Sequence, residues 1–245
     1  MVHLLLVAAI VLGFLIFSYP LMLSEKQMAK KNPRQQEHTL KIVQGILRLI
    51  FRATGSSLTV IGKENIPDSA VLYVGNHRSY FDIVTAYCVV PGLTGFVAKK
   101  EMGRYPILKD WMVLVNCIFL DRKNIKEGLK SILEGIEKVK GGVSMWIFPE
   151  GTRNTSEDIT ELMVFHEGSM KIAEKSGCPV IPVAITGTQE IFESHVPWIH
   201  PSKVTIEFGK PIYLKELPPE QRKRSGAYTR ERIIEMLREE QQRRN

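Results

Sequence analysis

A histidine and an aspartate five positions later are the residues of this sequence best suited to move a proton. They belong to the segment Asn76-His77-Arg78-Ser79-Tyr80-Phe81-Asp82, which follows an apolar run ending at Val74. On one continuous helix the two side chains would point about 140° apart, because each residue turns by about 100°. They can meet only if His77 lies on a loop and Asp82 in the first turn of the next helix. The carboxylate would then fix the ring tautomer and leave the other ring nitrogen as a general base.

The same segment also has a purely structural interpretation. Ser79 and Asp82 have the spacing of a helix capping box, and a single histidine near a strand end is often structural. The segment alone supports both interpretations.

Apolar runs and helical patterns alternate along the chain after residue 56. Strands are expected near Leu58–Ile61, Val71–Val74, Gly95–Ala98, Cys117–Leu120, Val143–Phe148, Val180–Ile185 and Val204–Phe208. Helices are expected near Phe81–Val90, Met102–Val115, Ile125–Val139, Glu167–Ser176 and Tyr228–Gln242. This alternation predicts an α/β domain with a largely parallel central sheet of about seven strands flanked by helices. In such a sheet, ligands bind beyond the carboxyl ends of the strands.

Charged residues recur where the predicted strands end. The three segments are Lys99-Lys100-Glu101, Leu120-Asp121-Arg122 and Phe148-Pro149-Glu150-Gly151-Thr152-Arg153. Each alone is typical of surface charge or a local ion pair. Their shared position places at least two cations near His77, which suits a phosphorylated substrate.

Composition and missing motifs narrow the function classes. The 245 residues carry a net charge of +7, which suits nucleic acid, anionic lipid or a phosphorylated substrate. Basic residues are not interleaved with stacking aromatics, so no nucleic-acid partner is expected. The cysteines are scattered without a C-x-x-C pair and the six histidines form no ligand-spaced cluster, so neither disulfides nor a metal site is expected. The sequence contains no G-x-S-x-G, Walker A, G-x-G-x-x-G or H-E-x-x-H motif.

The first 55 residues are expected to associate with a membrane. Residues Leu4 to Leu23 carry no charge and match the ~20 residues of a bilayer-spanning helix. The basic residues that follow, Lys26, Lys30, Lys31 and Arg34, fit the cytoplasmic side.

A second helix is expected over Glu37–Ala53, with an apolar stripe from Leu40 to Ile50. The stripe suits either the domain core or a lipid surface, and its closeness to the first helix favours lipid. We therefore expect residues 1–55 to form a monotopic two-helix hairpin on the cytoplasmic face of the cell membrane, with a single-pass anchor as the alternative. Residues 56–245 would form the catalytic domain.

Four blocks of the chain together resemble the glycerolipid acyltransferases. Asn76–Asp82 is similar to their N-H-x(4)-D block, Ile118–Arg122 to their second block, Phe148–Arg153 to their F-P-E-G-T-R block, and Val180–Val183 to their proline-bearing fourth. The blocks occur in the family order within roughly residues 57–210. Size and the short N-terminus resemble the bacterial 1-acylglycerol-3-phosphate acyltransferases most.

Two positions depart from the family pattern. Asn116 stands where the second block usually opens with glycine. Phe165-His166-Glu167-Gly168 replaces the frequent F-K-x-G, so His166 is expected to serve a helix start rather than a substrate.

The resemblance implies acyl transfer from a thioester of acyl carrier protein or coenzyme A to the sn-2 hydroxyl of lysophosphatidate, giving phosphatidate. It implies His77 as general base, Asp82 as its partner, and Arg153 as the phosphate contact, helped by Lys100 and Arg122. Glu150, Gly151 and Thr152 would shape the glycerol site, and Pro182 would lie near the thioester or acyl path. No cofactor is implied beyond the thioester co-substrate. The alternatives are another acceptor, such as glycerol 3-phosphate or a lysophospholipid, or a membrane-bound lipid-phosphate binding protein without turnover.

Overall fold

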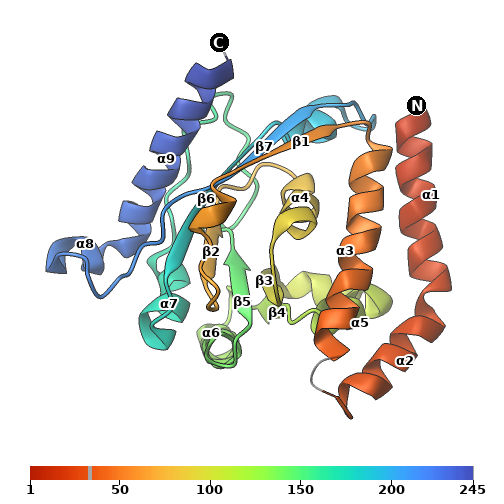
Figure 1. Ribbon diagram of the computed structural model, residues 1–245, viewed down its shortest axis with the longest axis horizontal. Helices are drawn as coiled ribbons and strands as arrows, with labels where there is room; N and C mark the ends of the chain where they lie inside the picture. Colours follow the sequence, from red (N-terminus) through yellow and green to blue (C-terminus); the bar gives the residue numbers. More distant parts are fainter. Residues whose placement is uncertain (33–34, 245) are drawn as a thin grey trace.

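A seven-stranded sheet runs through the centre of the protein (Figure 1). The computed structural model describes residues 1–32 and 35–244. The strands are β1 (Ser57–Ile61), β2 (Leu72–Gly75), β3 (Thr94–Lys99), β4 (Ile118–Leu120), β5 (Ser144–Ile147), β6 (Val180–Thr186) and β7 (Lys203–Phe208). Their order is β1-β7-β6-β2-β5-β3-β4, and the pairings are parallel except the antiparallel one between β6 and β7. The predicted α/β fold is confirmed.

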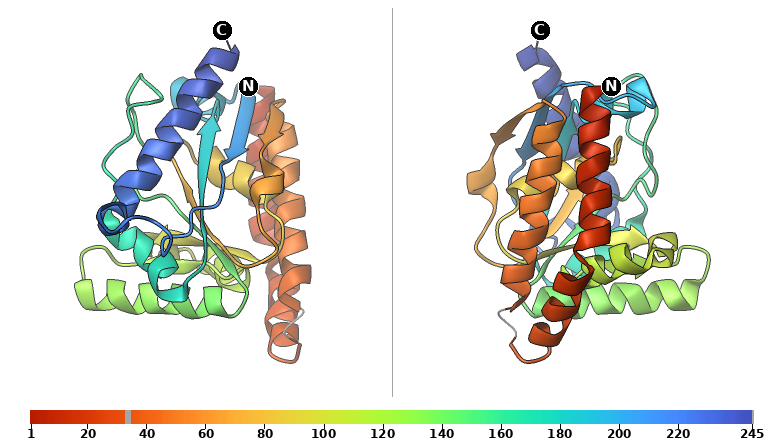
Figure 2. Two further views of the ribbon diagram at one scale, coloured as in Figure 1. Left: turned by 60° about the vertical axis from the view of Figure 1, so that its left-hand side comes forward. Right: turned by 90° about the vertical axis from the view of Figure 1, so that its right-hand side faces the viewer.

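Helices cover both faces of the sheet (Figure 2). One face carries α6 (Ile125–Lys140), α7 (Lys171–Ser176) and α9 (Ser225–Arg244), with the short α8 (Pro219–Lys223) before α9. The other carries α3 (Gln35–Ala53), α4 (Phe81–Val89) and α5 (Pro106–Leu114). Side chains of β2 alternate between the two cores, because successive strand residues point to opposite faces: Leu72 and Val74 join the first core and Tyr73 the second.

Two expected helices are shorter than their sequence patterns indicate. The segment expected over Met102–Val115 begins with a 3₁₀ turn, Lys100–Arg104, and α5 starts only at Pro106, a residue favoured in the first helical turn. The segment expected over Glu167–Ser176 likewise begins as a 3₁₀ turn, Glu167–Met170. The Glu167 carboxylate there accepts hydrogen bonds from the amides of Gly226 and Ala227, at the start of α9.

The turn before β4 explains one departure from the family pattern. Among the described residues, Asn116 is the one non-glycine residue with a positive φ, at 65°. Glycine adopts this left-handed conformation without strain, and asparagine is one of the few other residues that tolerates it. The Asn116 side chain also donates to Gln36 at 3.1 Å and accepts from Lys138 at 3.2 Å, which ties the turn to α3 and α6.

The apolar N-terminal segment is a bent pair of helices rather than one rod. α1 (Val2–Phe17) and α2 (Tyr19–Ala29) meet at Ser18 with a bend of 56°. Pro20, in the first turn of α2, lacks the N–H that an unbroken helix would use. The single helix expected over Leu4 to Leu23 is therefore wrong.

By length and hydropathy, no single helix in residues 1–32 and 35–244 qualifies as a membrane span, whereas α1 and α2 taken together do. Arg34, expected to extend the basic connector, lies outside the described residues.

The apolar stripe of α3 faces the protein. Leu40 and Ile50 are 5% and 7% exposed, and both pack into buried clusters. Gln44 and Arg48 donate to the carbonyls of Val90 and Cys88 at the end of α4. The prediction that this stripe lies on lipid is wrong, because the domain core covers it. α1 lies along the outside of α3 (Figure 1), so its own outer face stays exposed.

Candidate active site

The loop after β2 holds His77 at the carboxyl edge of the sheet. The strand ends at Gly75, and the Asn76 side chain then exchanges two hydrogen bonds with the backbone of Ile185 in β6, at 2.9 and 2.8 Å. These bonds fix the direction in which the loop leaves the sheet. The His77 ring stacks on Phe148, with centroids 4.2 Å apart and planes 13° apart, so its plane is fixed as well.

His77 and Asp82 meet as the spacing predicts. His77 lies on the loop, Asp82 lies in the first turn of α4, and Nδ1 of the ring is 2.8 Å from Oδ2 of the carboxylate. The side chain of Asp82 is 1% exposed and that of His77 is 15% exposed. With Nδ1 donating to the carboxylate, Nε2 is left as the basic nitrogen, and it has no hydrogen-bond partner among the described residues.

The capping box expected of Ser79 and Asp82 forms only in part, because the Ser79 amide donates to the Asp82 carboxylate but the Ser79 hydroxyl does not accept from the Asp82 amide. The amides of Arg78 and Ser79 donate to Asp82 Oδ2 at 2.7 and 2.8 Å. The Ser79 hydroxyl accepts from the amide of Phe81 at 2.9 Å. The cap and the His–Asp pair therefore share one carboxylate, and the cap holds that carboxylate where the ring needs it.

Glu150 supports the His77 loop from behind. Its carboxylate accepts hydrogen bonds from the amide of His77 at 2.9 Å, from Asn154 Nδ2 at 3.0 Å and from the amide of Met163 at 3.0 Å. Glu150 is 3% exposed, and burial raises the pKa of its carboxyl group. Both oxygens are used by the protein, so the position of Glu150 fits a supporting role better than the expected contact with glycerol.

Arg153 lies against Tyr80, which stands in the segment between His77 and Asp82. Its Nη1 is 2.9 Å from Glu193 Oε1, its Nη2 donates to the Tyr80 hydroxyl at 3.2 Å, and its guanidinium lies 3.8 Å above the Tyr80 ring. The Tyr80 amide donates to the same oxygen of Glu193 at 2.9 Å. About a third of the Arg153 side chain is exposed (34%), so a phosphate can approach it from solvent.

The other predicted cations occupy different positions along the rim. Arg122 donates to the carbonyl of Gly151 and thereby joins the Phe148–Arg153 segment, and burial lowers the pKa of its guanidinium. Lys100 is mostly exposed and pairs with Asp121 at 2.7 Å. Gly151 has a φ of 78°, the left-handed conformation that favours glycine.

Thr152, Pro182 and His166 are the remaining residues singled out from the sequence, and none of these three described residues is hydrogen-bonded to His77 or Asp82. Thr152 is exposed next to Gly151. Pro182 is buried within β6 and pairs with Val74 of β2. Its ring lies against Gly209, and its place near the thioester or acyl path stays a prediction. His166 stands at the start of the 3₁₀ turn Glu167–Met170, as expected of a helix start.

Three residues that sequence reasoning missed complete the site. Thr188, Gln189 and Glu193 all lie on the segment after β6, at the same edge of the sheet as His77. Thr188 Oγ1 donates to Asp82 Oδ1 at 2.5 Å, Gln189 accepts from Arg78 Nε, and Glu193 pairs with Arg153. Their position after a strand end is the one signal in the sequence that points to them.

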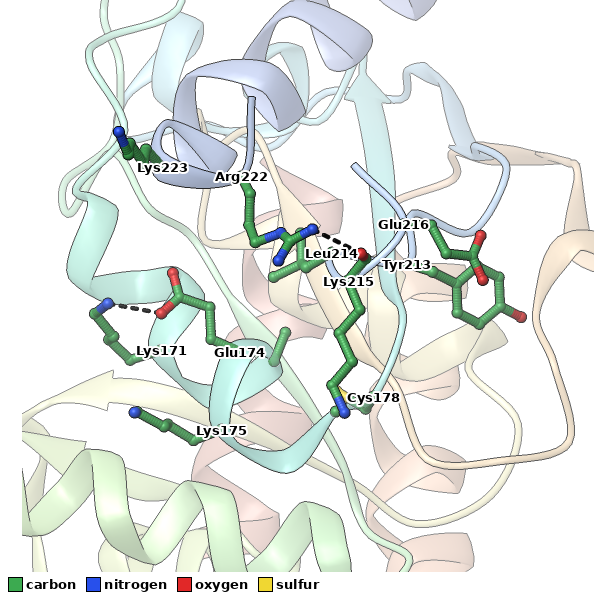
Figure 3. Close-up of a pocket in the computed structure, with 12 residues that line it drawn as sticks. Lys171, Glu174, Lys175, Cys178, Tyr213, Leu214, Lys215, Glu216, Arg222 and Lys223 are labelled. Atoms are coloured by element: carbon green, nitrogen blue, oxygen red, sulfur yellow. Dashed lines mark hydrogen bonds and ion pairs between the residues drawn. The ribbon is translucent and has the colours of Figure 1, made fainter. Parts of the chain in front are cut away.

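The described residues contain no cluster suited to a metal ion, and a large hollow among them lies away from His77. No group of three or more His, Cys, Asp or Glu residues among them lies close enough to hold a metal ion. A hollow of about 640 Å³ lies at the opposite edge of the sheet, near the start of β6 (Figure 3). Of its cations, Lys171 pairs with Glu174, and Arg222 donates to the carbonyl of Lys215. This hollow contains none of the residues that surround His77.

Comparison with known proteins places these features in one family. Residues 57–186 match the family model described as Acyltransferase. A probable 1-acyl-sn-glycerol-3-phosphate acyltransferase of Mycoplasma pneumoniae is 34% identical over 64% of this chain and 60% of its own length. The 1-acyl-sn-glycerol-3-phosphate acyltransferase of Saccharomyces cerevisiae is 26% identical over 76% of this chain and 61% of its own length. The chain thus spans about 60% of these two curated relatives.

A solved structure is similar over nearly the whole chain. The crystal structure of the 1-acyl-sn-glycerophosphate (LPA) acyltransferase, PlsC, from Thermotoga maritima matches with a TM-score of 0.82 and 28% identity. The match covers 98% of this chain and 95% of that one, the N-terminal helices included.

Proposed function

The chain belongs to the acyltransferase family, and we propose that it transfers a fatty acyl group from a thioester to the sn-2 hydroxyl of lysophosphatidate, forming phosphatidate. The observation that carries this proposal is the 2.8 Å hydrogen bond between His77 and Asp82, with the Arg153 guanidinium stacked on Tyr80 of the same segment. A binding protein would need only the cation. An oriented base with a free ring nitrogen is useful only if a proton moves.

In the proposed reaction His77 Nε2 takes the proton from the sn-2 hydroxyl as that oxygen attacks the thioester carbonyl carbon. Asp82 accepts the ring N–H and stabilises the imidazolium that forms. When the tetrahedral intermediate collapses, the carbon–sulfur bond breaks and the leaving thiolate takes the proton back from Nε2. The substrate supplies its own nucleophile, so no acyl-enzyme forms.

Arg153 is the proposed contact for the acceptor phosphate. A phosphate monoester carries a charge of about −1.5 to −2 near neutral pH, so it can compete with the single negative charge of Glu193 for the guanidinium. Arg122 and the exposed ammonium group of Lys100 would add positive charge along the same rim. The donor is a thioester of acyl carrier protein or of coenzyme A.

The test is to offer purified protein both kinds of thioester with lysophosphatidate, glycerol 3-phosphate or a lysophosphatidylcholine, and to identify the lipid product by mass spectrometry. Phosphatidate should form from lysophosphatidate in preference to products of the other acceptors. His77→Ala should lower turnover by about 10²–10⁴-fold, the contribution of a positioned general base, with an unchanged unfolding transition. Near-normal turnover in a folded His77→Ala protein would refute the mechanism. If the wild-type protein binds lysophosphatidate but forms no product, it is a lipid-phosphate binding protein rather than an enzyme.

We further propose that α1 and α2 hold the enzyme on the cytoplasmic face of the cell membrane. The exposed apolar side chains of this pair include Leu5, Leu12, Ile16 and Phe17 on α1 and Leu23 on α2. Lipid would cover this face and leave the His77 rim close to the headgroups, where a lipid acceptor and a cytosolic donor can both reach it.

Thiol labelling in intact cells tests this placement. Val2→Cys would be introduced into a variant that lacks Cys88, Cys117 and Cys178, and the cells treated with an impermeant thiol reagent. Protection until the cells are opened is the expected result. Labelling from outside would show that the N-terminus crosses the bilayer, in agreement with the single-pass alternative.

A further inference from the structure

The second oxygen of the Asp82 carboxylate is held by a residue outside the four sequence blocks. Thr188 Oγ1 donates to Asp82 Oδ1 at 2.5 Å. Thr188 and Asp82 are each 1% exposed, so water does not replace this bond. Among the described residues, Thr188 is the one hydrogen-bond donor to Oδ1.

The two carboxylate oxygens have different tasks. Oδ2 accepts three N–H groups, from the His77 ring and from the amides of Arg78 and Ser79. Those bonds fix the position of one oxygen, but the carboxylate can still turn about the axis through that oxygen. A bond to Oδ1 from another direction removes this freedom. Thr188 therefore sets the plane of the carboxylate, and with it the direction of the ring nitrogen that faces the substrate.

Thr188 is itself rigidly placed. It follows Gly187, which has a φ of 81° and whose carbonyl accepts a hydrogen bond from the Ser202 hydroxyl at 2.8 Å. The carbonyl of Thr188 accepts from the amide of Ile191 at 3.1 Å. The β-branched side chain has few rotamers available. The hydroxyl is thus fixed by the turn between β6 and β7, independently of α4.

We propose that Thr188 is a positioning residue of the acyl transfer: it orients Asp82 so that His77 directs Nε2 at the acceptor hydroxyl. This proposal rests on the function proposed above. Thr188 does not touch the substrate, so its removal should impair the chemical step and leave both substrates bound as before.

The test compares Thr188→Val with Thr188→Ser. Valine keeps the shape and removes the hydroxyl, whereas serine keeps the hydroxyl. We expect kcat to fall about tenfold in Thr188→Val, which corresponds to about 1.4 kcal/mol of transition-state stabilisation. KM for lysophosphatidate and for the thioester should stay within about twofold of wild type. Thr188→Ser should restore most of kcat.

Thr85→Val is the matched control. Thr85 lies on α4 three residues after Asp82, is fully buried, and its hydroxyl has no hydrogen-bond partner among the described residues. The same chemical change there should leave kcat unchanged. Equal kcat in wild type and Thr188→Val would overturn the proposal, as would equal losses in the valine and serine variants at position 188.

A second measurement separates this proposal from the proposed function. The NMR signal of the His77 Nδ1 proton reports its hydrogen bond to Asp82 without any turnover. It should shift upfield in Thr188→Val and remain in place in Thr188→Ser and Thr85→Val. An unchanged signal in Thr188→Val would refute the positioning role. Absence of acyl transfer in wild type with the expected NMR shifts would refute only the proposed reaction.

Discussion

Asp82→Asn separates the effect of the negative charge of Asp82 from the effect of its hydrogen-bond geometry. Oδ2 accepts three N–H groups, so the amide oxygen of asparagine should take that place. The amide nitrogen would then occupy the place of Oδ1 and face the Thr188 hydroxyl. A hydroxyl can turn to accept as well as donate, so every hydrogen bond of this network has a partner in the variant. The ring should keep its position and lose only the negative charge beside it.

The size of the effect follows from the interaction between that charge and the imidazolium. Nδ1 and Oδ2 are 2.8 Å apart, which places the centres of the two charges about 4 Å apart. At an effective dielectric constant of about 20 the attraction is about 4 kcal/mol. Each 1.36 kcal/mol is a factor of ten in rate, so kcat should fall by about 10³-fold.

The assay is phosphatidate formation at saturating acceptor and donor, with thermal unfolding followed in parallel. Loss of a negative charge at the start of α4 costs about 0.3–1 kcal/mol of stability, so the variant should remain folded. Asp82→Ala is the comparison, because it removes both charge and geometry and should be at least as inactive. A folded Asp82→Asn protein that retains more than a tenth of wild-type kcat would refute the electrostatic role of Asp82.

Five further substitutions, at four positions, test other parts of the protein. Arg153→Ala should raise the acceptor KM by about tenfold or more, since a charge-assisted hydrogen bond contributes about 1.5–3 kcal/mol. Glu193→Gln should lower the acceptor KM, because it removes the charge that competes with the phosphate. If Arg153→Ala changes only the thioester KM, Arg153 contacts the donor instead. Glu150→Gln should cost about 1–3 kcal/mol of stability at low pH, because its amide nitrogen cannot accept the hydrogen bonds that one of the two carboxyl oxygens accepts in wild type. Burial raises the Glu150 pKa, so the native state binds this proton more tightly than the unfolded state does. The difference in unfolding free energy between wild type and Glu150→Gln should therefore shrink as the pH rises through the folded-state pKa. A difference that grows with pH would contradict this prediction. Asn116→Ala should destabilise by about 1–2 kcal/mol and Asn116→Gly by less, since glycine relieves the positive φ; equal melting temperatures for the two variants would argue against strain at this turn.

Most of the sheet was predictable because its signal is local. Runs such as Val180–Ile185 are apolar and β-branched over the length of one strand, and the structure has β6 there. The meeting of His77 with Asp82 was predictable for a related reason, since the spacing allows one geometry only. The helix break at Ser18 could also have been predicted locally, from Pro20. The continuous apolar composition of the segment favoured a single helix instead.

The remaining features depend on contacts between distant segments. An apolar stripe such as Leu40 to Ile50 suits lipid and a protein core equally, and only the position of α4 decides between them. Thr188 reaches Asp82 because β6 lies next to β2 in the sheet and the turn after β6 points back over the site. Likewise the Glu193–Arg153 pair joins two segments whose proximity no spacing in the sequence encodes.

The strand order has a consequence for the order in which the protein assembles. β1 lies at the sheet edge and pairs with β7. Ser57 therefore cannot pair with Lys203 until more than half of the chain, which lies between them, has been synthesised. At about 5–20 residues per second, synthesis takes on the order of ten seconds to reach β7 after β1 has emerged. Contacts this distant in sequence also form slowly. The helices α1 and α2 therefore leave the ribosome long before the sheet can close. The Gly187–Thr188 turn directly follows β6, and the carbonyl of Gly187 is held by Ser202, the residue before β7. We therefore expect the Asp82 carboxylate to gain its last hydrogen bond at the end of folding, when the N-terminal helices have long left the ribosome.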